Sequence, residues 1–183
     1  MHWMAWWKLC VPKKNGGLGF RDLHAFNLAM LAKQSWRLIT NPDTLCARVL
    51  WTKYYPHGNV LKAGPKKGSS FTWQSIVAGL NTFCRGYIWR VGSGENINIW
   101  EDHWVPGSPT RQVVTPKTGI LLRSVDEIID QESGNWDEGL IRFIFYPVDA
   151  DRILQIPLND HLHEDFVAWH MTKIYAFSVR SAY

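Results

Sequence analysis

The chain has 183 residues, of which 46% are hydrophobic and 20% charged, and its formal net charge is +4. This much apolar material excludes a disordered chain and permits one domain, or two small units joined by a linker. Three widely spaced cysteines, Cys10, Cys46 and Cys84, provide neither a disulfide framework nor paired zinc ligands, which favours a reducing compartment. No apolar run approaches the roughly 18–20 residues of a membrane span, and the aromatic start does not resemble a secretory signal.

Charge is distributed unevenly along the sequence. Residues 1–68 contain eleven Lys or Arg but only Asp22 and Asp43 as acids, a net charge of +9, whereas the rest of the chain carries −5. This asymmetry predicts that the N-terminal third faces a polyanion. A solvated basic face without any partner remains the alternative, because charge alone does not identify nucleic acid.

The first half of the chain is predicted to be helical. Glycines make a basic turn of Lys13–Gly19. Capping residues, apolar faces and prolines then predict three helices: one from Asp22 as cap to about Thr40, one capped by Asp43 or Thr44 and broken at Pro56, and one over roughly 70–83.

The second half mixes strands with short helices. Alternating apolar residues predict a β-hairpin of 87–91 with 96–100 across a glycine-rich turn, and a second hairpin of 165–171 with 174–179. Short helices are expected over 124–130, with Ser124 as cap, 137–145 and 149–154, and another helix could start near Ser181. The predicted class is α+β, with segments 1–84 (basic, helical), 85–123 (hairpin and proline-rich linker) and 124–183 (acidic, ending in a hairpin).

Glu101 and Asp102 are the strongest candidates for a catalytic centre. A carboxylate pair leaving a hairpin can hold two metal ions for nucleotidyl transfer, but this chemistry needs a further carboxylate on a neighbouring strand. No such acid lies on another apolar strand. We therefore expect solvated acids at a strand end.

Other arrangements are weaker still. His161, His163 and His170 could offer imidazoles to zinc, but their spacing matches no metalloprotease motif and surface histidines are the simpler interpretation. Cys84 lies in no nucleophile motif. The glycines of 16–19, 64–70 and 92–96 fit turns better than phosphate loops. We expect no metal, no cofactor and no small-molecule substrate.

The basic N-terminal segment carries the remaining functional signal. Cations alternate there with aromatic residues: Lys8, Lys13, Lys14 and Arg21 with Trp3, Trp6, Trp7 and Phe20. Ammonium and guanidinium groups neutralise phosphates, and aromatic faces stack on unpaired bases. These residues are the candidate nucleic-acid site. The alternative is that the tryptophans pack against the first long helix.

Five segments carry a resemblance to a known family: 3–23, 25–38, 90–94, 99–104 and 177–183. Together they resemble the region that follows the polymerase core in plant LINE-type (non-LTR) retrotransposon reverse transcriptases. The chain is also similar to short plant mitochondrial reading frames. In the family, the polymerase aspartates precede this region, and a Cys/His zinc-binding region, sometimes with a ribonuclease H domain, follows it.

The resemblance implies a connector near template RNA or nascent DNA. Neither the Asp-Asp polymerase motif nor the Cys/His cluster occurs here, so no catalytic residue or metal ligand carries over. We expect a non-catalytic fragment, not an enzyme, that binds RNA or DNA without sequence preference. The alternatives are a module that docks on the polymerase domain and a non-functional remnant. The compartment, nuclear, mitochondrial or elsewhere in the cell, stays open.

Overall fold

The computed structural model describes residues 5–56, 58–158 and 164–183, which belong to two compact units. Residues 1–86 and 177–183 form the first unit, and residues 87–176 form the second. Helices and a two-stranded antiparallel sheet confirm the α+β class. The three segments expected from the sequence stay a prediction. No helix in the described ranges has the length and hydropathy needed to cross a membrane.

The first unit is built from helices whose starts follow the predicted caps. Its elements are α1 (Trp6–Cys10), the 3-10 turn η1 (Lys13–Asn15), α2 (Leu23–Thr40), α3 (Leu45–Tyr54), the 3-10 turn η2 (Val60–Lys62), α4 (Phe71–Cys84) and α7 (Val179–Ala182). The side chains of Asp22, Thr44 and Ser70 accept backbone N–H groups at the starts of α2, α3 and α4. The three predicted helices are thus confirmed. Helix α1 was not predicted, because five residues are too few to show a period.

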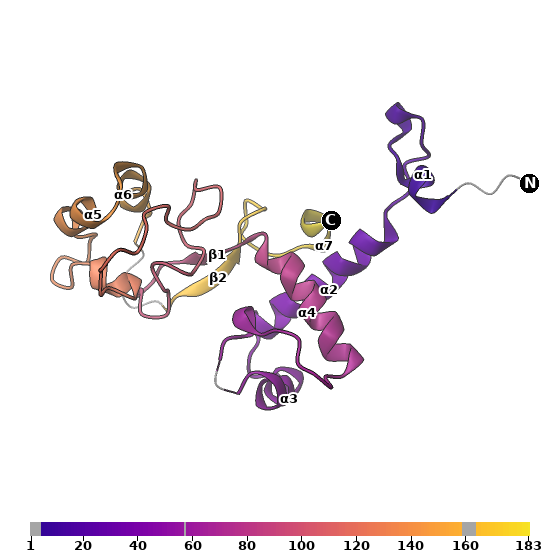
Figure 1. Cartoon of the computed structure of the whole chain (residues 1–183), viewed down its shortest axis with the longest axis horizontal. Coiled ribbons are helices and arrows are strands. Elements are labelled where there is room, and N and C mark those ends of the chain that lie inside the picture. Colours follow the sequence, from indigo (N-terminus) through magenta and orange to yellow (C-terminus); the bar gives the residue numbers. More distant parts are fainter. Residues whose placement is uncertain (1–4, 57, 159–163) are drawn as a thin grey trace, which may run out of the picture. The chain divides into compact units, whose positions relative to one another are not determined.

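Helices α2 and α4 cross in contact with each other in the first unit (Figure 1). Their backbones come so close that a Cβ atom on Gly79 would lie 2.4 Å from the carbonyl carbon of Leu31. On α2 the facing residues are small and fully buried, Ala29, Ala32 and Ser35, and the Ser35 hydroxyl donates to the carbonyl of Ile76 at 3.2 Å. Small side chains therefore set the spacing of this helix pair.

The second unit surrounds an apolar core with short elements. They are β1 (Tyr87–Arg90), the 3-10 turn η3 (Val125–Ile128), α5 (Glu138–Ile144), α6 (Pro147–Leu154) and β2 (Phe166–Trp169). Ile97, Ile99 and Trp104 are fully buried in the core, and the Trp104 indole donates to the carbonyl of Ile99 at 3.0 Å. The core thus forms largely from residues outside regular strands.

The strand pairing corrects both predicted hairpins. Strands β1 and β2 lie side by side (Figure 1) and pair antiparallel, with Tyr87 opposite Trp169 and Arg90 opposite Phe166. Residues 96–100 turn away and instead form an isolated bridge between Asn98 and Ser124. The reason is long-range: the carboxylate of Asp165 accepts the backbone N–H groups of the intended turn, from Gly92, Gly94 and Asn96, at 2.8–2.9 Å.

The predicted hairpin of 165–171 with 174–179 fails for a local reason. After β2 the chain makes a tight turn in which Tyr175 has a positive φ of 55° and its carbonyl accepts the N–H of Trp169 at 2.7 Å. A residue in this left-handed region cannot continue an extended ladder. The strand Phe166–Trp169 is therefore free to pair with β1.

The short predicted helices are found with changed bounds. The first is the 3-10 turn η3, closed by a capping box of Ser124 and Glu127. Backbone N–H groups of Ser124 and Arg123 hold the pKa of the Glu127 carboxyl below its usual range. Helix α6 begins at Pro147, two positions before the predicted start, because proline fits the first position of a helix.

Candidate nucleic-acid interface

The basic loop, residues 5–21, is a closed substructure at the start of the first unit. After α1 and the turn η1, the chain returns on itself: the N–H of Gly19 donates to the carbonyl of Val11 at 2.9 Å, and that of Phe20 donates to Leu9 at 3.1 Å. A Cβ atom on Gly17 would overlap the backbone of Val11. This close approach requires glycine and fixes the shape of the loop.

The aromatic side chains of the basic loop face solvent. Trp6 stacks on Phe20 with ring centroids 5.8 Å apart and planes at 4°, and each side chain is about half exposed, 48% and 49%. Trp7 is 67% exposed. Neither indole is buried against α2, so the alternative of tryptophans packed on that helix does not describe Trp6 or Trp7. Trp3 lies outside the described residues.

The basic loop carries exposed lysines, one of them over a tryptophan ring. The ammonium of Lys8 lies 5.3 Å from the centre of the Trp7 ring, and Lys13 and Lys14 are exposed on η1. Within 5–56, 58–158 and 164–183, none of these three lysines has an ion-pair partner. Nearby, the Asp22 carboxylate is occupied by the N–H groups of His24 and Ala25. The basic loop can thus offer positive charge and open aromatic faces together.

Arg21 ends the basic loop and faces a different set of neighbours. Its guanidinium lies 5.9 Å from the centre of the Phe26 ring on α2. Arg21 and Phe26 line an open groove on the first unit. Two residues from the far end of the chain, Arg180 and Tyr183, line this groove as well. Sequence reasoning missed these two, since no local pattern links positions so far apart.

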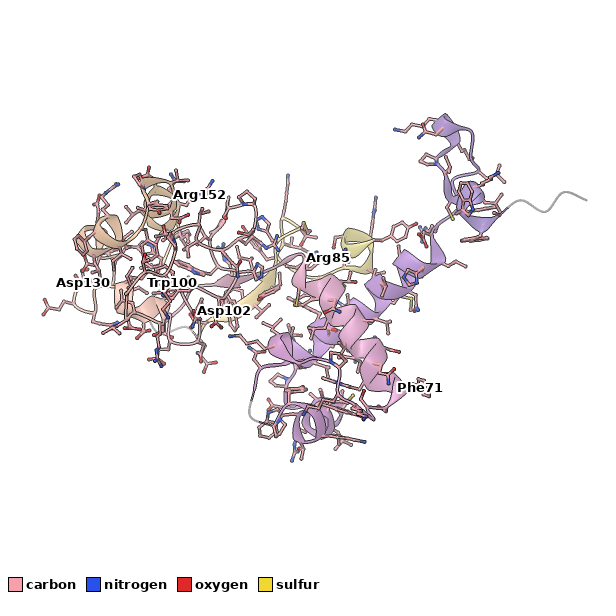
Figure 2. The ribbon with its side chains drawn as sticks, viewed as in Figure 1. Phe71, Arg85, Trp100, Asp102, Asp130 and Arg152 are labelled. Atoms are coloured by element: carbon pink, nitrogen blue, oxygen red, sulfur yellow. The ribbon has the colours of Figure 1, made fainter. Side chains whose placement is uncertain are left out.

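The other candidate centres are placed differently from expectation. Asp102 is 9% exposed, not solvated, and its carboxylate accepts the N–H of Asn98 at 2.8 Å, which closes the loop that holds Trp100 (Figure 2). In the fold, the Asp102 carboxylate thus serves as a hydrogen-bond acceptor for the backbone of this loop. Glu101 remains exposed.

The histidine and cysteine candidates do not form a site among the described residues. His161 and His163 lie outside those residues, and His170 is exposed. Burial raises the pKa of the Cys84 thiol, which lowers its thiolate fraction at neutral pH. In the described part of the chain, no group of three His, Cys, Asp or Glu residues could hold a metal ion.

Two proteins of Arabidopsis thaliana are similar in sequence. "Uncharacterized mitochondrial protein AtMg00310" is 43% identical over 104 residues, which are 56% of this chain and 68% of that protein. "Putative ribonuclease H protein At1g65750" is 32% identical over 193 residues, which cover 100% of this chain but only 30% of that protein. No protein-family model and no solved structure matches the chain.

Proposed function

This chain belongs to the family of the Arabidopsis thaliana mitochondrial protein AtMg00310, and we propose that it is a non-catalytic part of a plant LINE-type retrotransposon reverse transcriptase. The five resembling segments support this assignment. So does the similarity, along the whole chain, to a much longer protein whose name refers to ribonuclease H, a domain that sometimes accompanies such polymerases. We assign no catalytic step to its own residues, since the polymerase Asp-Asp motif does not occur in the sequence.

The activity that we propose is sequence-independent binding of single-stranded nucleic acid by the basic loop. The observation that carries it is the exposed Trp7 ring, whose centre lies 5.3 Å from the Lys8 ammonium. The same loop exposes Lys13 and Lys14, and neither has an ion-pair partner among the residues that the structure describes. The lysine ammonium groups attract the phosphates of a nucleic-acid strand, and the tryptophan ring can stack on its unpaired bases. Such contacts are made to the phosphates and to the faces of the bases, which all four bases share, so they carry no base preference.

The test is fluorescence anisotropy with a labelled oligothymidylate of about 12 nucleotides, a length typical of single-strand sites. The triple variant K8Q/K13Q/K14Q should bind more weakly, and the slope of log K against log salt should fall by roughly 2, since each phosphate contact contributes about 0.7. The matched control K117Q/R123Q/K173Q removes three exposed charges from the second unit. Equal slopes for the two triple variants, or no binding by the wild type at low salt, would refute the proposal.

A second candidate function is docking on a polymerase domain. Helix α3 favours it, because three of its apolar side chains are exposed: Leu45 at 76%, Val49 at 55% and Trp51 at 50%. Leu45 and Val49 lie about one turn apart on the same face of α3, and an exposed apolar face marks protein contacts. Capture of a polymerase fragment by the wild type, lost in L45S/V49S/W51S and insensitive to ribonuclease, would favour docking over nucleic-acid binding.

A further inference from the structure

An open groove of about 700 Å³ lies on the first unit, next to the basic loop. Residues from both ends of the sequence line it: Arg21, Phe26, Met30, Val179, Arg180 and Tyr183. The volume falls in the range of roughly 300–1,000 Å³ that small-ligand sites occupy. The groove combines aromatic rings with positive charge, which restricts the chemistry of what it can bind.

The aromatic wall of the groove is held in place. The rings of Phe26 and Tyr183 meet edge to face, with centroids 6.3 Å apart and planes at 73°. The Tyr183 hydroxyl accepts the backbone N–H of Asp22 at 2.7 Å, which fixes the phenol at the start of α2. Half of the Tyr183 side chain is nevertheless exposed, so a planar group can reach its ring.

Two guanidinium groups provide the charge. Arg21 and Arg180 are both exposed, and over the described residues neither has a carboxylate within ion-pair distance. A guanidinium donates to phosphate oxygens in a forked geometry, which makes unpaired arginines beside an aromatic ring suited to a nucleotide.

We propose that this groove is a nucleotide subsite for single-stranded nucleic acid. A base lies against the wall made by Phe26 and Tyr183, and the adjoining phosphates contact Arg21 and Arg180. A paired base has no free face for such a wall, so a duplex does not fit. This inference rests on the proposed function and extends it, since Arg21 joins the basic loop to the groove.

The experiment compares Y183L with Y146L, because Tyr146 is 54% exposed, has the same chemistry and lies in the second unit. Y183L should weaken binding of the labelled oligothymidylate about tenfold, consistent with the loss of one stacked base. On an abasic strand of the same length, Y183L should bind like the wild type. Y146L should match the wild type on both strands.

A second comparison tests the role of charge. The double variant R21Q/R180Q removes both arginines of the groove, and the control R48Q/R123Q removes two exposed arginines outside it. The first pair should lower the salt slope by roughly 1.4 and the second should not. A measurement on the unmodified chain avoids any folding defect of Y183L: a strand carrying 5-iodouracil should photo-crosslink to the peptides that contain Phe26 or Tyr183.

The outcomes separate the groove from the basic loop. If the wild type binds and K8Q/K13Q/K14Q weakens it, but Y183L equals Y146L and no crosslink reaches Phe26 or Tyr183, the groove is refuted and the proposed function stands. An equal loss by Y183L on the normal and abasic strands also refutes base stacking. If the wild type binds no single strand, both proposals fail.

Discussion

The backbone N–H of Asp22 donates a hydrogen bond of 2.7 Å to the hydroxyl of Tyr183, although 161 positions separate the two residues. Tyr183 thus anchors the C-terminal segment at the first turn of α2. The same segment is held further along α2, where the ammonium of Lys33 donates to the carbonyl of Phe177 at 3.0 Å. Phe177 is itself buried and packs against the rings of both Trp36 and Phe83.

Replacing Asp22 should weaken the start of α2. Its carboxylate accepts the N–H groups of His24 at 2.8 Å and Ala25 at 3.2 Å, and both lose their acceptor in D22A. We expect the free energy of unfolding to fall by about 1 kcal/mol, measured by urea denaturation with circular dichroism. D22S keeps an acceptor and should remain close to the wild type. A D22A curve that overlays the wild type would contradict this role.

Gly79 should tolerate no side chain, because the backbone of α2 occupies the space that a Cβ atom needs. G79A should lower the free energy of unfolding by about 3 kcal/mol, at the upper end for overpacking, since backbone cannot move aside as a side chain can. G139A on α5 is the control, because the nearest atom to its Cβ is 3.5 Å away on Asp137. Denaturation should leave G139A unchanged or slightly stabilised; equal behaviour of the two variants would show that the helices are not in close contact.

Asp165 should govern the loop of residues 92–96. In D165N one carboxylate oxygen becomes an NH₂ group that cannot accept, so at least one of the N–H groups of Gly92, Gly94 and Asn96 loses its partner. Loss of a charged acceptor costs about 2 kcal/mol, and these amides should exchange with solvent faster in hydrogen-exchange NMR. E164Q changes the exposed neighbouring carboxylate and should leave the exchange rates unaltered. Unchanged protection in D165N would show that the loop is held by other contacts.

His103 should make the second unit sensitive to acid. Burial lowers the pKa of its imidazole below the usual 6.5, against a smaller raising effect of the hydrogen bond with the carbonyl of Thr110. Below pH 6.5 the unfolded chain takes up a proton at this position while the folded chain does not. The contribution of neutral His103 to the free energy of unfolding is therefore fully present above pH 6.5. This contribution is lost as the pH falls from 6.5 toward the lower pKa of the folded state.

The check is a series of thermal melts between about pH 7.5 and 5, a range that brackets the ordinary histidine pKa. H103Q should show a shallower loss of the melting temperature than the wild type, and H170Q, which changes an exposed histidine, should follow the wild-type slope. A slope in H103Q as steep as that of the wild type would remove His103 as the cause.

Helices α2, α3 and α4 could be predicted because their signals are local. Asp22, Thr44 and Ser70 each cap a helix within three residues along the chain, and the side chains buried from α4 follow a helical period. The positive charge and aromatic rings of the basic loop were likewise readable from order and composition. The extent to which Trp6 and Trp7 face solvent was not, because exposure depends on what packs nearby.

What the sequence by itself determined is therefore the three helices α2, α3 and α4, their caps and the uneven charge, since these follow from residues within a turn or two of each other. Tertiary structure alone decided which strand pairs with β1 and which residues complete the groove at Arg21. Asp165 redirects a turn that would otherwise close a hairpin, and Tyr183 reaches Asp22 from the far end of the chain. Such contacts close long loops, and the entropic cost of closing them is offset by the packing of the whole unit rather than by any local pattern.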